Sequence, residues 1–131
     1  MTYWQFAVYH TEDGRDLTQE WYDNEEPEVQ AKFDSILRIL EGTEDLSRYE
    51  KFFSCLKKEH LGLWEIRFWI VKEKKYRPVG FFTFTYHQFV LVLGCHKIGG
   101  NYYPHDAFNV ALELRRQFLE EGRGTIHERR F

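Results

Sequence analysis

The chain has 131 residues, of which 43% are hydrophobic and 30% are charged, a balance that fits one globular domain and excludes a disordered or collagen-like chain. No apolar run approaches the ~18 residues of a membrane-spanning helix, and the first residues lack the basic and apolar regions of a signal peptide. The two cysteines, Cys55 and Cys95, lie far apart without metal-ligand spacing. We therefore expect a single domain over residues 1–131 that is reduced, cytoplasmic and free of membrane contact.

The net charge of −3 conceals an uneven distribution along the chain. Residues 1–45 hold twelve acidic and three basic residues, a balance of −9, whereas residues 46–131 hold nine acidic and fifteen basic residues, a balance of +6. This segregation predicts a basic face in the second part that attracts phosphate, with the acids mostly on the opposite side. Ordinary solvated surface on both parts is the alternative interpretation.

The N-terminal part is predicted to form one strand and two helices. Residues 3–9 alternate loosely and are rich in aromatic side chains, as in a strand. Asp16 is placed to cap a short helix that follows it. A longer helix is predicted from Pro27 to about residue 41, because an apolar stripe at helical spacing lies between Pro27 and Gly42. Residues 43–60 fit either a helix or a loop held by aromatic side chains.

The hydrophobic period changes to two at Leu63. We expect three antiparallel strands in succession over residues 63–93, namely 63–71, 76–86 and 89–93, the last buried on both faces. A loop over 94–103 and a helix over 104–121, with Pro104 in its first turn, complete the domain, and the tail after Gly124 either adds a short strand or stays free. The expected fold class is α+β, with helices packed on a mostly antiparallel sheet.

The common enzyme signatures are absent from the sequence. It contains no nucleotide-binding glycine motif, no nucleophile elbow and no His-x-x-x-His pair among six histidines, so we expect neither a cofactor nor a metal site. What remains is a set of cations on or beside the predicted strands: Arg67, Arg77 and Lys97. Taken alone, the alternation favours Arg67 as a surface arginine that pairs with Glu65 or Glu73.

Together, several segments resemble a known family. They are Gly62-Leu-Trp-Glu-Ile-Arg-Phe68, Tyr76-Arg77, Val90-Leu-Val-Leu-Gly94-x-x-Lys97, and Pro104 before a helix that contains Ala111. In this order they resemble the RelE/ParE/HigB superfamily of toxin–antitoxin toxins, and most closely its HigB-like, phage-derived branch. The resemblance implies a RelE-like fold: an N-terminal strand and two helices, an antiparallel three-strand meander, and a C-terminal helix packed on the sheet.

The resemblance also implies a function. It predicts a type II toxin and mRNA endoribonuclease (mRNA interferase) that acts on the ribosome and is silenced by a cognate antitoxin. The family's cationic positions carry over to Arg67, Arg77 and Lys97. The chain departs from the family in two ways: it has Lys97-Ile-Gly-Gly-Asn101 where a lysine pair and a threonine are usual, and its isoelectric point of about 6.1 is not basic.

RNA is cut without a metal when its 2′-hydroxyl attacks the neighbouring phosphate, a reaction that needs a base, an acid and cations near the developing charge. We expect Arg67 and Arg77 to converge on one sheet face, and His127 or His96 to exchange protons. The remaining expected RNA contacts are Tyr102, Tyr103 and Arg129, with Trp69 either stacking on a base or packing in the core.

Two alternatives stay open at this stage. One is a toxin-fold protein that acts by binding a protein target, as in the gyrase-directed ParE branch. The other is a phage or mobile-element protein that keeps the fold but has lost catalytic activity. The mildly acidic isoelectric point and the altered loop after Lys97 favour the second alternative.

Overall fold

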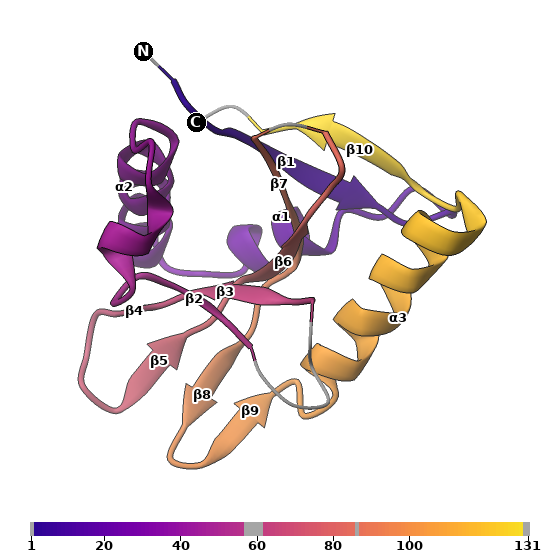
Figure 1. Ribbon diagram of the computed structural model, residues 1–131. Helices are drawn as coiled ribbons and strands as arrows, with labels where there is room; N and C mark the ends of the chain where they lie inside the picture. Colours follow the sequence, from indigo (N-terminus) through magenta and orange to yellow (C-terminus); the bar gives the residue numbers. More distant parts are fainter. Residues whose placement is uncertain (1, 57–61, 86, 130–131) are drawn as a thin grey trace.

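The computed structural model describes residues 2–56, 62–85 and 87–129, which form an α+β domain (Figure 1). The helices are α1 (Leu17–Asp23), α2 (Pro27–Glu41), the 3₁₀ turn η1 (Leu46–Tyr49) and α3 (Ala107–Glu121). The strands are β1 (Gln5–His10), β2 (Phe53–Cys55), β3 (Trp64–Ile66), β4 (Phe68–Trp69), β5 (Lys74–Tyr76), β6 (Val79–Phe82), β7 (Gln88–Leu93), β8 (His96–Ile98), β9 (Asn101–Tyr103) and β10 (Thr125–Glu128). No helix in these residues is long and apolar enough to cross a membrane.

The larger of two sheets has six strands in the order β10-β1-β7-β6-β3-β2. Strand β1 runs parallel to β7, and the other neighbouring pairs are antiparallel. Helix α2 covers one face and α3 the other, so the central strand β7 is buried on both sides (Figure 1). Phe89 and Leu91 point toward α2, whereas Val90 and Val92 point toward α3. The continuous apolar run of this strand is thus explained by two helical layers.

The smaller sheet has four antiparallel strands in the order β4-β5-β8-β9. It is formed because three segments pass from the larger sheet into the smaller one. The breaks fall at Arg67 between β3 and β4, at Arg77-Pro78 between β5 and β6, and at Gly94-Cys95 between β7 and β8. The predicted strand 63–71 is therefore two short strands, β3 and β4, and the predicted strand 76–86 is replaced by β5, which begins earlier at Lys74, and the shorter β6. The third segment extends past residue 93 into β8.

The breaks have local causes. Pro78 lacks the N–H that a ladder needs, and the Arg67 N–H donates to the carbonyl of Phe52, 2.7 Å away. At Gly94 an added Cβ would lie 2.0 Å from the Trp21 ring, so only glycine lets α1 approach this close. Together these positions bend three strands at the same level.

Several other predicted helices and strands are present, and two differ from the prediction. Helix 27–41 is confirmed, as is the cap at Asp16, whose carboxylate accepts from the Gln19 N–H. The tail strand is present as β10, and the ambiguous segment holds η1 and β2. The loop predicted over 94–103 is wrong, because residues 96–103 form the β8–β9 hairpin. Helix α3 begins at Ala107 rather than at Pro104.

Part of two predictions lies outside the described residues, namely Tyr86 at the predicted end of the second strand and residues 57–60 of the ambiguous segment.

The predicted separation of charge is incomplete. Arg123 lies 2.7 Å from the Glu12 carboxylate, and Arg129 lies 3.7 Å from Asp34, so acids of the first part meet bases of the second. Arg116 contacts Glu113 at 2.6 Å on the outer side of α3. These arginines are compensated locally, because each lies beside a carboxylate.

Candidate nucleic-acid interface

The bend between the two sheets brings a carboxylate between two arginines. Glu65 of β3 is buried, with 3% of its side chain exposed, and points to the α3 side of the sheet. Its Oε1 accepts a hydrogen bond from Arg67 Nε at 2.8 Å and lies 3.9 Å from Arg77 Nη1. Arg67 is 36% exposed and Arg77 only 12%. One buried negative charge therefore holds two cations, and the trio keeps a net positive charge.

Cys95 and Tyr102 border this trio. The Cys95 thiol donates to the Arg77 carbonyl at 3.0 Å, and burial raises its pKa to about 12, with the Glu65 charge acting in the same direction. Burial also raises the pKa of Tyr102, as does Glu65, while Arg77 opposes the shift. Both groups therefore keep their protons at neutral pH.

Two polar atoms of the trio retain hydrogen-bonding capacity. Within the described part of the chain, Glu65 Oε2 and Arg77 Nε are buried and have no hydrogen-bond partner. Buried polar atoms are usually paired, so unpaired ones indicate a site that is completed by another molecule or by solvent.

The smaller sheet extends this site as a row of side chains. Trp69 of β4 pairs with Lys75 of β5, Lys75 with Lys97 of β8, and Lys97 with Tyr102 of β9. Directly opposed residues of antiparallel strands point to the same face, so these four side chains share one face. Because Tyr102 also packs on Phe108 at the start of α3, the row continues the α3 side of the domain beyond that helix.

We call this surface the basic face. It consists of Arg67, Trp69, Lys75, Arg77, Lys97 and Tyr102. Trp69 is 55% exposed, which is unusual for so large an apolar ring, and the Lys97 ammonium lies 5.3 Å from the centre of the Tyr102 ring. The surface thus combines cations with accessible aromatic rings.

The pairing of Lys75 with Lys97 places two like charges directly opposite each other. Such pairs destabilise a sheet, and an anion bound between the two ammonium groups would relieve the repulsion. Both lysines, together with Lys72 and Glu73, line a shallow hollow of about 420 Å³ at the tips of the two hairpins. Three lysines against one glutamate give this lining a net positive charge, which favours an anion.

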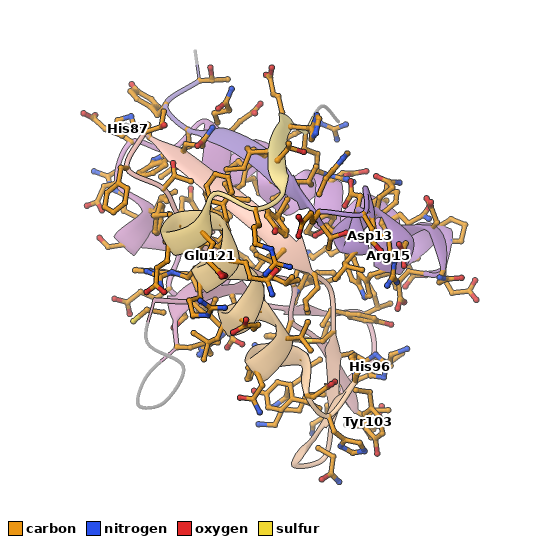
Figure 2. The ribbon with its side chains drawn as sticks, turned by 90° about the vertical axis from the view of Figure 1, so that its right-hand side faces the viewer. Asp13, Arg15, His87, His96, Tyr103 and Glu121 are labelled. Carbon is orange, nitrogen blue, oxygen red and sulfur yellow. The ribbon has the colours of Figure 1, made fainter. Side chains whose placement is uncertain are left out.

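Four of the eight site residues predicted from the sequence lie on the basic face: Arg67, Arg77, Lys97 and Tyr102. His96 and Tyr103 lie on the opposite face of the smaller sheet, where their rings stack at 5.5 Å (Figure 2). Burial lowers the pKa of His96, and the charge of Lys74 lowers it further. His96 and Tyr103 are thus separated from Arg77 by the thickness of the sheet.

His127 and Arg129 lie at the other edge of the molecule. Strand β10 is outermost in the larger sheet, and three strands separate it from β3, a distance of roughly 19 Å at the usual strand spacing. His127 stacks on His10 at 3.9 Å. Arg129 is 8% exposed and lies 4.7 Å from the centre of the Tyr22 ring, so its guanidinium is held in the protein interior.

Sequence reasoning did not include Glu65 or Lys75 in the site. It named Glu65 only as a partner for Arg67, a pairing that the structure confirms, and left Lys75 between the first two predicted strands, whereas it belongs to strand β5. Alternation could have identified Lys75, because residues two positions apart in a strand point to the same face. Lys75 therefore lies on the side of Arg77, and Tyr76 on the other. The bend that joins Glu65 to both arginines had no comparable signal.

Comparison with protein-family models, with curated proteins and with solved structures gave no match to this chain. Among the described residues, no group of three or more His, Cys, Asp or Glu side chains is placed to hold a metal ion.

Proposed function

We propose that the chain is an RNA-binding endoribonuclease of the RelE-like toxin type, and that RNA binds across the basic face. The observation that carries the proposal is the convergence of four cations and two aromatic rings on one face of the domain. Cations supply affinity for phosphate, and aromatic rings stack on unpaired bases. Single-stranded RNA offers both kinds of group along its length.

Arg67 and Arg77 are suited to the scissile phosphate. A guanidinium can donate two parallel hydrogen bonds to phosphate oxygens. The buried Glu65 carboxylate orients Arg67 through a hydrogen bond and holds Arg77 nearby as an ion pair at 3.9 Å. Fixed donors stabilise charge that develops on the phosphorane without reorganising during the reaction. The lysine pair, farther along the face, is placed to bind a flanking phosphate.

Cleavage by this site would follow transesterification. The RNA 2′-oxygen forms a bond to phosphorus, the bond from phosphorus to the 5′-oxygen breaks, and the products carry a 2′,3′-cyclic phosphate and a 5′-hydroxyl. Tyr102 holds its proton at neutral pH and lies on the same face, so it is the proposed proton donor to the 5′-oxygen. Solvent hydroxide or a group on the ribosome would take the 2′-hydroxyl proton.

A second candidate, RNA binding without cleavage, is favoured by one observation. Neither His96 nor His127 lies on the basic face. If the chain cleaves RNA by the proposed route, the cleavage rate should rise with pH through neutrality without an inflection near the histidine pKa. If it only binds RNA, no cleavage is expected at any pH.

We further propose that a cognate antitoxin covers the site. An acidic segment of that partner would neutralise Arg67, Arg77 and the lysine pair and exclude RNA by occupying the same surface. The test is hydrogen exchange of the backbone around Arg67 and Arg77 with and without the product of the adjacent gene. Unchanged exchange there would contradict the proposal.

The experiment that tests function is single-turnover cleavage of a single-stranded RNA, on ribosomes and free, with RNA ends mapped. Arg77→Ala is expected to reduce the rate by about 10²-fold or more, as loss of one transition-state donor usually does, and Arg77→Lys to restore only part of it. Arg116→Ala is the matched control, because this arginine lies on α3 away from the basic face. Wild-type rates for a folded Arg77→Ala protein would contradict cleavage at this site.

The same preparations separate the two candidates. If wild-type protein binds RNA but leaves a 2′-deoxy-substituted and an unmodified strand equally intact, with and without ribosomes, the chain is a binding protein.

A further inference from the structure

A cavity of about 680 Å³ lies at the β2 edge of the larger sheet, between β2, β3 and the segment that includes η1. Aromatic rings form its floor and inner wall: Trp4, Phe53, Trp64 and Phe82. The rings contact one another, with Trp64 5.0 Å from Phe53 and 5.3 Å from Phe82, and Trp4 5.3 Å from Phe82. Packing of this kind gives a preformed apolar surface, and the volume is in the range of small-molecule sites.

The rim of the cavity is acidic. Glu44, Asp45 and Glu50 line it from the segment around η1. Asp45 uses one carboxylate oxygen to accept from the Ser47 backbone N–H and hydroxyl, which fixes that side of the rim. Arg67 also lines the cavity; its Nε donates to Glu65, so the three rim carboxylates outnumber the one cation of the lining.

We propose that this cavity binds a linear polyamine, with ammonium groups against the rim carboxylates and over the aromatic rings, and with methylene segments on the apolar floor. Aromatic faces attract cations, and the attraction grows when the cation is partly removed from water. Several carboxylates around one cavity favour a ligand with more than one positive charge. A phosphate-bearing ligand is disfavoured here, since the same carboxylates would repel it.

Arg67 borders both the cavity and the basic face, but the lysines of the basic face do not line the cavity. A variant such as Lys75→Glu is therefore expected to lose RNA affinity and to keep polyamine affinity, so the two proposals can fail separately.

The test is calorimetric titration of the full chain with spermidine at low ionic strength, repeated with putrescine and with a neutral diol of similar length. We expect saturable binding that weakens as salt rises, at least threefold weaker binding of putrescine, and no detectable binding of the diol. Binding of the diol as tight as that of spermidine would show that charge plays no part and would overturn the proposal. Absence of saturable spermidine binding would also overturn it.

Two variants locate the ligand. Glu44→Gln/Glu50→Gln is expected to weaken spermidine binding at least tenfold, while the control Glu26→Gln/Glu28→Gln removes the same charge at the other end of α2 and should change it less than twofold. Trp64→Leu is expected to weaken binding at least threefold. A melting curve for each protein confirms that it is folded. Equal losses in both double variants would mean general charge attraction and would contradict a site in the cavity.

Discussion

Replacement of Glu65 by glutamine tests the buried ion trio on which the basic face is built. The substitution keeps the size of the side chain and removes the charge that compensates Arg77, whose side chain is only 12% exposed and lies 3.9 Å from Glu65. Removing one member of a buried ion pair typically costs ~3–5 kcal/mol, because the other charge is left buried. Glutamine can still accept from Arg67, so we take about 3 kcal/mol, which lowers the melting temperature by roughly 12 °C in a chain of this size.

Urea unfolding followed by far-ultraviolet circular dichroism measures this loss. Arg77→Met added to Glu65→Gln removes the unpaired cation and should recover most of the stability, so the double variant is expected within about 1 kcal/mol of wild type. Glu113→Gln, which breaks an exposed pair on α3, is the control and should leave the unfolding midpoint nearly unchanged. A loss below about 1 kcal/mol for Glu65→Gln, or additive losses in the double variant, would refute the reasoning.

Three further predictions concern the same framework. Burial raises the Cys95 pKa from 9.0 to about 12, so the folded state keeps a proton that the unfolded state loses; stability should fall between pH 9 and 12, and less steeply in Cys95→Ala. Parallel urea midpoints for both proteins would contradict this. Lys75→Gln removes the repulsion with Lys97, so it should raise the urea midpoint slightly. It should also lower the salt dependence of RNA binding by about one phosphate contact, and an unchanged salt dependence would exclude Lys75 from the interface. Gly80→Ala places a Cβ 2.1 Å from the Val90 carbonyl oxygen and should cost about 3 kcal/mol, and a loss below 1 kcal/mol would contradict the packing described.

The parts of the fold that could be predicted from sequence are those with a regular period. Helix 27–41 carries its stripe between a proline and a glycine, and the run at residues 89–93 is apolar on both faces. The bend between the two sheets was not predictable in this way, because it depends on which distant backbone groups are hydrogen-bonded to each other. The Arg67 N–H, for example, donates to Phe52, fifteen positions earlier in the chain.

The candidate site, like the fold, was predictable only where residues follow a regular strand pattern. Arg67 and Arg77 could be placed on neighbouring strands by alternation, and the structure brings them together at Glu65. Lys97 was expected in a loop, and its position on the same face follows from its pairing with Lys75 in β8. The histidines could not be placed, because the side to which His96 points depends on the register of a hairpin that the sequence indicated as a loop. The location of His127 depends on the pairing of a tail strand with β1.

Amide chemical-shift mapping gives the most direct test of whether RNA binds across the basic face. In a titration of isotope-labelled protein with a short single-stranded RNA at low salt, the largest shifts are expected in β4, β5, β8 and β9 and at the bend around Arg67 and Arg77. The β10 strand and the exposed side of α2 should stay within the shifts that an equal ionic strength of sodium chloride produces. Shifts concentrated on β10 or α2, with the smaller sheet unaffected, would contradict the account.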